Sequence, residues 1–213
     1  MGTEIEDVPE ISVEWYREVT AFAGHTPEWV RQAAEVGTDA ILVLLFAFLV
    51  FGWWRARRED DRRMALALLA PVAVVAAYVT SEGVKILLQQ RRPCWDLTGV
   101  ATVASCPPYG DWSLPSNHAT FAAAAAAALV ALWRGARIVA PALAVLAAFS
   151  RVFVGVHYPH DVVAGLLLGA VVASAFLLAL RGPATTLISS MRRRPVLTTV
   201  LTTDRQPAPP RGR

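Results

Sequence analysis

Residues 64–88, "MALALLAPVAVVAAYVTSEGVKILL", form a long apolar run whose only charges are Glu82 and Lys85, and Lys85 is the single lysine of the chain. A helix rises 1.5 Å per residue, so about 20 residues are enough to cross the ~30 Å hydrocarbon core of a bilayer. A lone strand would leave its backbone groups unpaired in lipid. The run therefore predicts a membrane-spanning helix with the single lysine of the chain near its end.

The composition of the whole chain agrees with a membrane protein. Hydrophobic residues make up 55% of its 213 residues, charged residues make up 17%, and the mean hydropathy is +0.43. These values argue against a soluble domain. Four further apolar stretches occupy residues 36–54, 118–133, 138–156 and 162–180. We predict an all-α, polytopic membrane helical bundle with about five transmembrane helices, which together form a domain over residues 36–182.

The segment before this domain, residues 1–35, is acidic, with eight acids and two arginines. It lacks the positive charge of a secretory signal, so no cleavage is expected. Apolar residues recur at helical spacing at Ile11, Trp15, Val19 and Phe22, which favours either an interfacial helix or a short helix packed on the bundle. Thr26, Pro27 and Glu28 are typical of a helix start. Residues 183–213 contain many Pro, Thr and Arg residues without an apolar period, which predicts a disordered tail.

Arginine placement predicts the orientation, because loops rich in Lys and Arg stay in the cytoplasm. Five arginines follow the first span in "RARREDDRR", two follow the third in "RGAR", and seven lie after the fifth. By alternation, the N-terminus, residues 91–115 and the loop around His157 face outward. Cys94 and Cys106 lie in that outer loop, where the compartment permits either a disulfide or two free thiols.

Polar residues gather at the outer ends of the spans. Lys85 and Arg92 are seven residues apart and share a face if their helix continues beyond the membrane. The other polar residues at this level are Ser116, Asn117, His118, Ser150, Arg151, His157 and Asp161. Four helix ends therefore bring cations, hydroxyl groups, two imidazoles and a carboxylate to one depth on one side.

Each of these residues also has an ordinary interpretation. Lys85 can extend its ammonium to the interface or pair with Glu82. Arg151 can cap helix carbonyls, His118 and Asp161 can be helix-start residues, and His160 can be an interface residue. However, an ionisable residue inside a span costs about 2.5–3.5 kcal/mol on insertion scales. The convergence of several such residues therefore favours a functional site.

This set of groups suits the hydrolysis of a phosphate ester. Cations and donors at a helix N-terminus hold anionic oxygens. One histidine can attack phosphorus while a carboxylate holds its far nitrogen, and the second histidine can protonate the leaving oxygen. The pattern requires no metal and no other cofactor, and it does not indicate a nucleic-acid partner.

Three motifs resemble, in order and spacing, the signatures of the type-2 phosphatidic acid phosphatase superfamily: "K-x6-RP" at Lys85–Pro93, "PSNH" at Pro115–His118 and "SR-x5-H-x3-D" at Ser150–Asp161. The resemblance covers about residues 80–180. It implies that His157 is a nucleophile forming a phosphohistidine, Asp161 orients it and His118 is the general acid. It also implies a phosphate-binding set, namely Lys85, Arg92, Ser116, Arg151 and the backbone near Asn117. Asn117 departs from the usual glycine, although Asn tolerates left-handed backbone angles.

The short N-terminal helix and five spans look like the bacterial branch that hydrolyses polyprenyl diphosphates. The implied function is a plasma-membrane lipid phosphatase with an outward-facing site that converts a polyprenyl (undecaprenyl-type) diphosphate to the monophosphate and so recycles the carrier lipid for cell-wall precursors. The alternative within the superfamily is a phosphatidate or phosphatidylglycerophosphate phosphatase. Two other classes stay open: a membrane transporter, and a metallohydrolase with His118, His157, His160 and Asp161 as ligands. The oligomeric state does not follow from these patterns.

Overall fold

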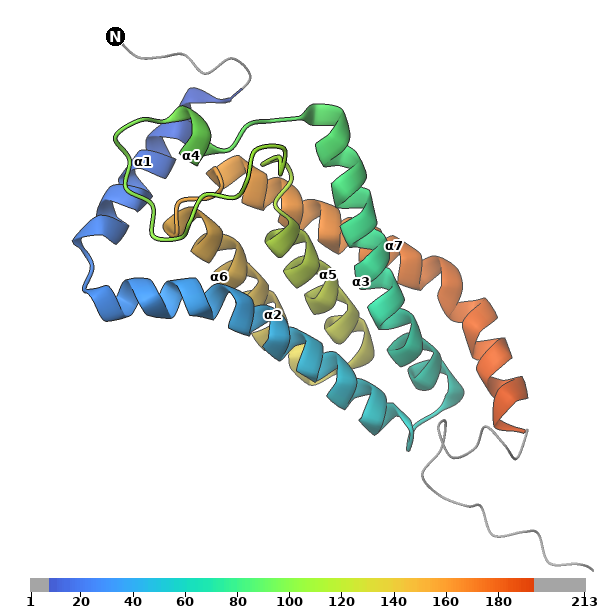
Figure 1. Ribbon diagram of the computed structural model, residues 1–213. Coiled ribbons are helices and arrows are strands. Elements are labelled where there is room, and N and C mark those ends of the chain that lie inside the picture. The colour runs from blue at the N-terminus through green and yellow to red at the C-terminus, as the bar shows by residue number, and fades with distance from the viewer. Residues whose placement is uncertain (1–7, 194–213) are drawn as a thin grey trace, which may run out of the picture.

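The computed structural model describes residues 8–193, and this part of the chain contains helices and loops but no strand. The elements, coloured along the chain in Figure 1, are α1 (Glu10–His25), α2 (Glu28–Ala56), α3 (Asp61–Leu88), α4 (Pro93–Asp96), α5 (Asn117–Leu132), the 3₁₀ turn η1 (Arg134–Ala136), α6 (Val139–Phe153) and α7 (Pro159–Arg192). Each of the five predicted spans corresponds to one of the long helices. The prediction of an all-helical bundle is confirmed.

The helix α5 is the centre of the bundle. It packs against α2, α3, α6 and α7, and its alanine run from Ala122 to Ala128 is largely buried. The segments that contain the four surrounding helices are long and apolar enough to cross a membrane, whereas α5 has 16 residues. Its small side chains let the longer helices approach closely, as is common between membrane helices.

The closest approach is between α5 and α7. A Cβ atom added at Gly169 would overlap the carbonyl oxygen of Thr120, and one added at Gly165 would overlap the carbonyl oxygen of Ser116. Only glycine fits at these two positions of α7. The contact sets the spacing between the two helix ends that carry the histidine and aspartate motifs.

The helix α3 ends at Leu88, where the predicted span ends, and does not continue to Arg92. Gln89 adopts the left-handed conformation with φ 48°, and Arg92 is extended at the start of α4. Pro93 prevents one continuous helix, because its ring would clash with the carbonyl of Gln89 four residues earlier and because Arg92, directly before it, is disfavoured in the helical region. The condition for Lys85 and Arg92 to share a face, a helix that continues to Arg92, is therefore not met, and the two side chains converge from separate segments.

The helix α7 extends further than predicted, because residues 183–192 are helical and not disordered. Ile188 is buried against Met64 and Ala65 of α3, and the Nη1 atom of Arg192 lies 2.8 Å from Oδ1 of Asp61. These contacts with a distant segment stabilise a helix that local composition does not indicate. The remainder of the predicted tail, residues 194–213, lies outside the described residues.

The N-terminal helix α1 packs on α6 and α7 through an unexpected face. Its buried residues are Ser12, Tyr16, Thr20 and Ala23, and the Tyr16 hydroxyl donates to the carbonyl of Gly155 over 2.9 Å. The predicted apolar face keeps Ile11, Trp15 and Phe22 exposed. The helix therefore packs on the bundle and still presents an apolar stripe outward. The predicted boundary at residue 35 falls inside α2.

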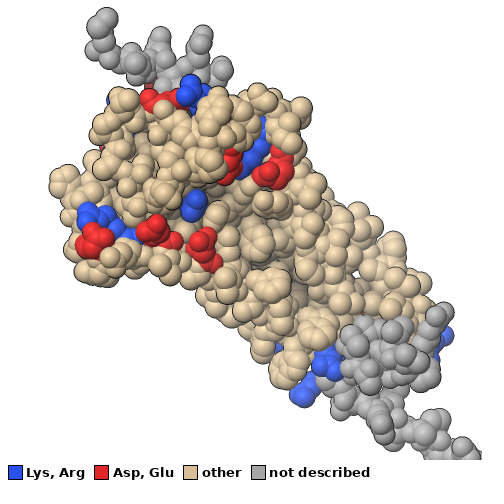
Figure 2. Space-filling model, viewed as in Figure 1, with Lys and Arg blue, Asp and Glu red and all other residues tan. Residues whose placement is uncertain are grey.

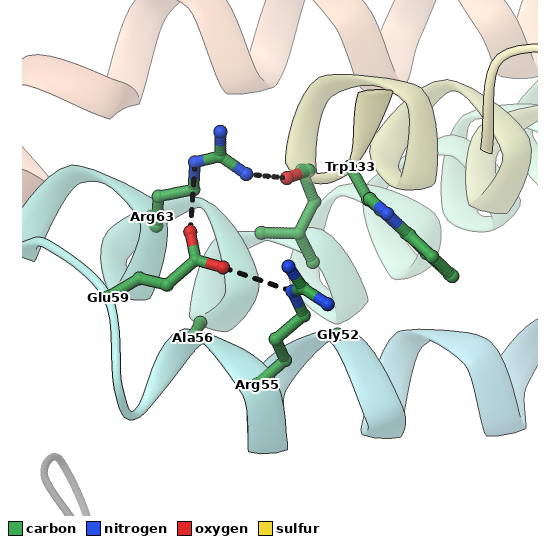
Figure 3. Close-up of a pocket in the computed structure, with 7 residues that line it drawn as sticks. Gly52, Arg55, Ala56, Glu59, Arg63 and Trp133 are labelled. Carbon is green, nitrogen blue, oxygen red and sulfur yellow. Dashed lines mark hydrogen bonds and ion pairs between the residues drawn. The ribbon is translucent and has the colours of Figure 1, made fainter. Parts of the chain in front are cut away.

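Charged side chains lie mainly at the two ends of the molecule in the view of Figure 2, with an uncharged middle between them. At the end remote from α1, Glu59 accepts from Arg55 over 3.1 Å and lies 3.2 Å from Nε of Arg63. Arg63 also donates to the carbonyl of Leu132, which links α3 to α5 (Figure 3). This arrangement is the one expected of a bundle that crosses a membrane.

At the opposite end, residues 89–116 form a loop over the bundle (Figure 1). A disulfide joins Cys94 and Cys106. Of the two predicted alternatives, a disulfide or two free thiols, the structure has the disulfide. Trp95, Tyr109 and Trp112 form an aromatic cluster in the same loop. The loop connects α3 to α5 and brings its own side chains to the site described next.

Candidate active site

A cavity of about 300 Å³ opens at the loop-covered end of the bundle. Polar groups from α3, α5, α6 and the loops face it, together with the apolar side chains of Leu42, Tyr78 and Phe121. The predicted site residues in its wall are Lys85, Arg92, Asn117, His118, Arg151 and His157. Ser116 and Asp161 do not line it. The structure thus brings six of the eight predicted residues to one cavity.

His157 lies at the bottom of this cavity in the turn between α6 and α7 and is 2% exposed. Its Nε2 atom is 3.0 Å from Nη1 of Arg92. A guanidinium can only donate, so Nε2 must carry a lone pair and Nδ1 the proton. The neutral tautomer with a free Nε2 electron pair is the one that a nucleophilic histidine requires.

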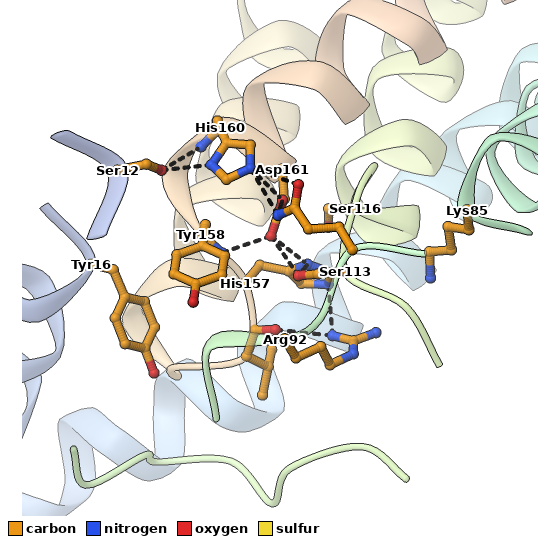
Figure 4. Close-up of polar contacts among 12 residues, drawn as sticks. Ser12, Tyr16, Lys85, Arg92, Ser113, Ser116, His157, Tyr158, His160 and Asp161 are labelled. Carbon is orange, nitrogen blue, oxygen red and sulfur yellow. Dashed lines mark hydrogen bonds and ion pairs between the residues drawn. The ribbon is translucent and has the colours of Figure 1, made fainter. Parts of the chain in front are cut away.

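Nδ1 of His157 faces Ser113 and Asp161, as Figure 4 shows. Nδ1 lies 3.2 Å from the Ser113 hydroxyl and 3.5 Å from Oδ2 of Asp161. The Ser113 hydroxyl donates to the same Oδ2 over 2.5 Å. The carboxylate therefore holds the imidazole largely through a serine hydroxyl, and a direct contact at 3.5 Å is too long for a good hydrogen bond.

Asp161 is fully buried in the first turn of α7 and has further partners. Its Oδ2 accepts from the backbone N–H of Tyr158 over 2.8 Å, and its Oδ1 accepts from Nε2 of Gln90 over 3.0 Å. These bonds, with those of Ser113, satisfy both oxygens and keep the carboxylate in one orientation. Neither Ser113 nor Gln90 was predicted from the sequence, because a lone serine or glutamine in a loop has no distinctive spacing.

Burial lowers the pKa of His157 to about 3, since the cationic form would lose its hydration, and the charge of Arg92 acts in the same direction. The nearby Asp161 carboxylate raises the pKa and so opposes this shift without cancelling it. His157 is therefore neutral throughout the physiological pH range.

The cations of the cavity come from three separate segments. Lys85 and Arg92 are both 3% exposed, so Lys85 does not extend to the interface. It lies 3.7 Å from Glu82, but its closer partner is Asp111, whose Oδ1 is 3.1 Å from Nζ. Arg92 reaches the same oxygen over 3.0 Å. Asp111 was not among the predicted site residues.

Two polar atoms at predicted phosphate-binding positions are buried without a hydrogen-bond partner. They are Nε of Arg151 in the cavity wall and Oγ of Ser116 at the start of α5. Buried polar groups are normally paired, so unpaired donors mark a position where a ligand or water can bind. Ser116 instead contributes its backbone N–H, which donates to the carbonyl of Asp161 over 3.0 Å.

His118, the second histidine of the cavity, is held in place by a carboxylate from α2. Nε2 of His118 lies 2.8 Å from Oδ1 of Asp39 in α2. Because a carboxylate accepts, Nε2 of His118 is the protonated nitrogen. The neighbouring Asn117 accepts from the Ser81 hydroxyl over 2.8 Å and donates to Glu82. Its side chain therefore braces α5 against α3, and its donor is already in use.

The sequence profile of the PAP2 superfamily matches residues 66–182, more than half of the chain. All the predicted motifs fall within this range. The chain belongs to the PAP2 superfamily. With its apolar helices, this PAP2 protein is a multi-pass membrane protein.

One curated relative of this PAP2 protein is the undecaprenyl-diphosphatase of Sulfolobus acidocaldarius, 34% identical over 116 residues. The alignment covers 52% of the chain and 52% of the relative, so the chain spans about half of that protein's length.

Two solved structures share the PAP2 fold. One is LpxE of Aquifex aeolicus, with a TM-score of 0.62 and 22% identity, covering 83% of this chain and 99% of that one. The other is a transmembrane PAP2-type phosphatidylglycerolphosphate phosphatase from Bacillus subtilis, with a TM-score of 0.60 and 20% identity, covering 82% and 88%. Both likenesses concern the arrangement of the helices.

The metal ligands considered for a metallohydrolase do not converge in this PAP2 protein. Within residues 8–193 no group of three or more His, Cys, Asp or Glu side chains is arranged to hold a metal ion. His160 turns away from the cavity toward α1, where its Nδ1 lies 2.7 Å from the Ser12 hydroxyl, and its Nε2 contacts Gln90 (Figure 4). His160 thus ties α1 to the network behind Asp161.

Proposed function

We propose that this protein is a membrane lipid phosphatase that hydrolyses a polyprenyl diphosphate to the monophosphate. The observation that carries the proposal is the unprotonated Nε2 of His157, which accepts from Arg92 at the wall of a cavity lined by Lys85, Arg92 and Arg151. A neutral nucleophile beside three cations suits a phosphate ester, whose oxygens bear negative charge.

In the proposed reaction, Nε2 of His157 attacks the terminal phosphorus, the bond to the bridging oxygen breaks, and the lipid monophosphate leaves. His118, in its cationic form with the Nε2 proton held by Asp39, gives the proton of Nδ1 to the leaving oxygen. The imidazole of His157 becomes cationic in the phosphohistidine, and Asp161 stabilises that charge through Ser113. A water molecule, deprotonated by His118, then attacks phosphorus and releases inorganic phosphate. Each bond broken is matched by one formed, and no redox step is involved.

The polyprenyl chain is favoured by two observations. The named activity of the archaeal relative is undecaprenyl-diphosphatase. The cavity also has an apolar side, formed by Leu42, Tyr78 and Phe121 from three helices, next to the cations. A lipid whose chain leaves along this side keeps its tail in the bilayer while its phosphate enters the cavity.

An outward-facing site is supported by the residues at the two ends of the helical bundle. The Cys94–Cys106 disulfide lies beside the cavity, and disulfides persist in oxidising compartments outside the cytoplasm. The arginines Arg55, Arg63 and Arg134 lie at the opposite end, in connections that follow the positive-inside rule.

The test is to trap the phosphoenzyme from polyprenyl diphosphate labelled on its terminal phosphate. We expect the label on His157 and no label in His157→Ala, which should lose nearly all turnover. His118→Ala should still bind substrate and slow the chemistry by about 10²–10⁴-fold, as for a lost general acid. His25→Ala, which changes an exposed histidine of α1, is the matched control and should behave as the wild type.

Substrate and mechanism are separated in the same assay. Polyprenyl diphosphate should be hydrolysed with a higher kcat/KM than phosphatidate or phosphatidylglycerophosphate, and EDTA should leave the rate unchanged. A higher kcat/KM for a glycerophospholipid would replace the substrate but keep the histidine mechanism. Label on another residue, or full activity in His157→Ala, would refute the mechanism itself.

A further inference from the structure

Asp111 places a carboxylate where the phosphate of the proposed reaction would have to bind. Its Oδ1 atom is 3.1 Å from Nζ of Lys85 and 3.0 Å from Nη2 of Arg92, and Asp111 lines the cavity with both of them. One oxygen shared by an ammonium and a guanidinium is the geometry in which such cations hold a phosphate oxygen. The anion position of the site is therefore filled by a group of the protein.

The arrangement allows this carboxylate to leave without disturbing the cations. The Asp111 side chain is 46% exposed, whereas those of Lys85 and Arg92 are each 4% exposed. Arg92 has other partners, because its Nε donates to the backbone carbonyl of Asp111 over 2.6 Å and its Nη1 donates to the carbonyl of Val156 over 3.0 Å. The guanidinium thus stays in place when the side chain of Asp111 turns away.

The charges around the cavity make simultaneous binding unfavourable. Burial raises the pKa of Asp111, but the charges of Arg92 and Lys85 outweigh this effect and hold the pKa below its ordinary value. Asp111 is therefore anionic at neutral pH. A carboxylate and a phosphate on the same two cations would repel each other, since like charges in a partly desolvated site are screened less than in water.

We propose that Asp111 is an internal competitor that occupies the phosphate position of the resting enzyme and is displaced when the substrate phosphate binds. This inference rests on the proposed function. When a site is open for only part of the time, its apparent affinity falls by that fraction. Asp111 weakens the binding of every anion by the same factor. Free phosphate therefore binds poorly, whereas a lipid with additional contacts along its chain still binds.

The same competition helps the product to leave. After hydrolysis, inorganic phosphate lies on Lys85 and Arg92 without a covalent link to a lipid. The return of the Asp111 carboxylate replaces both ion pairs at once. The cations are then never left unpaired in a buried site, which would be the costly intermediate.

The test compares Asp111→Asn with the wild type in the binding of inorganic phosphate, measured by calorimetry on the purified full-length protein in detergent. Asparagine keeps the shape but not the charge, and we expect its Kd for phosphate to be about tenfold lower, which corresponds to Asp111 holding the site about nine-tenths of the time. Asp96→Asn is the matched control. Asp96 lies in the same loop and pairs with Arg91 over 3.0 Å outside the cavity, so its loss should leave the Kd unchanged.

A second measurement uses the unaltered protein and decides the matter if the variant does not fold. A carboxylate that is released from its cations becomes accessible to a water-soluble carbodiimide. We expect orthovanadate to increase the labelling of Asp111, found by mass spectrometry, and to leave the labelling of Asp96 unchanged. Labelling of Asp111 that falls or stays constant with orthovanadate would overturn the inference.

The outcomes separate this inference from the function on which it rests. If Lys85→Met weakens phosphate binding but Asp111→Asn does not strengthen it, the anion site exists and the competitor role is refuted. Weaker phosphate binding in Asp111→Asn would also refute the competitor role. Asp111 would then hold Lys85 and Arg92 in position for phosphate instead of competing with it. If the wild type binds neither phosphate nor orthovanadate, and Lys85→Met changes nothing, both proposals fail.

Discussion

Ser113 stands between the imidazole of His157 and the carboxylate of Asp161, whose Nδ1 and Oδ2 atoms are 3.5 Å apart. Its hydroxyl accepts from Nδ1 and donates to Oδ2, so both contacts depend on one side chain. This position is the residue-scale feature on which the proposed nucleophile most depends. Two expectations belong to this scale.

Ser113→Ala should lower kcat by about 10- to 100-fold, the range found for groups that orient a reacting side chain, with little change in KM. The reason is that alanine leaves Nδ1–H with a distant carboxylate and the imidazole less firmly oriented. Rapid-quench measurement of phosphoenzyme formation tests this. Thr80→Ala, on the exposed face of α3, is the control. An effect confined to KM would mean that Ser113 acts on binding.

The pH dependence follows from the buried state of His157. Its pKa is lowered to about 3, so the neutral, nucleophilic form persists as the pH falls from 7 toward 4. His118 must be protonated to act as the acid, so the rate should decline as the pH rises and that proton is lost. We therefore expect no acid limb from His157 and a single decline of kcat/KM as the pH rises and His118 loses its proton.

Initial rates between pH 4 and 9 test this expectation. The unfolded state takes up a proton on His157 below its ordinary pKa, about 6.5, and the folded state does not, so stability also decreases as the pH falls. Rates must therefore be taken on freshly diluted enzyme, with the folded fraction checked at each pH. An acid limb centred near the ordinary histidine pKa would contradict a buried nucleophile.

At the scale of helices, the contact between α5 and α7 is the most restrictive feature. Gly169→Ala would drive a Cβ atom into the backbone carbonyl of Thr120, which cannot move as a side chain can. Overpacking typically costs about 1–3 kcal/mol, so the Tm in detergent should fall by several degrees, with a loss of activity as the two helix ends separate.

Gly182→Ala is the matched control for this substitution. Gly182 lies on the same helix, α7, and a Cβ atom added there has no neighbouring atom within 4 Å. Alanine is the better helix former, so this variant should be at least as stable as the wild type. A Tm for Gly169→Ala equal to that of the control would show that α5 and α7 have room to separate.

The helices also show what the sequence could and could not predict. Apolar length and composition were sufficient for the five spans, and motif spacing was sufficient for six residues of the cavity. The break after α3 at Gln89 depends on Pro93, which cannot continue the helix. The extension of α7 to Arg192 depends on the contact of Arg192 with Asp61, which lies in a distant part of the sequence. Asp39 and Asp111 reach the site from distant segments, so no local pattern marks them.

At the scale of the whole molecule, the orientation in the membrane can be measured with single cysteines. Tyr109→Cys, in the exposed part of the loop beside the cavity, should react with an impermeant maleimide in intact cells. Arg137→Cys, beside η1 at the opposite end, should react only after the membrane is opened. The reverse pattern would place the cavity in the cytoplasm and contradict an outward-facing site.

The cavity lies at the loop-covered end of the bundle, and an uncharged middle separates the two charged ends of the molecule in Figure 2. If the cavity lies at the level of the lipid headgroups, a substrate reaches it by lateral diffusion within one leaflet and never passes through bulk water. Turnover would then follow the mole fraction of the lipid in the bilayer. Dilution with inert phospholipid should slow the enzyme even at a constant total amount of substrate.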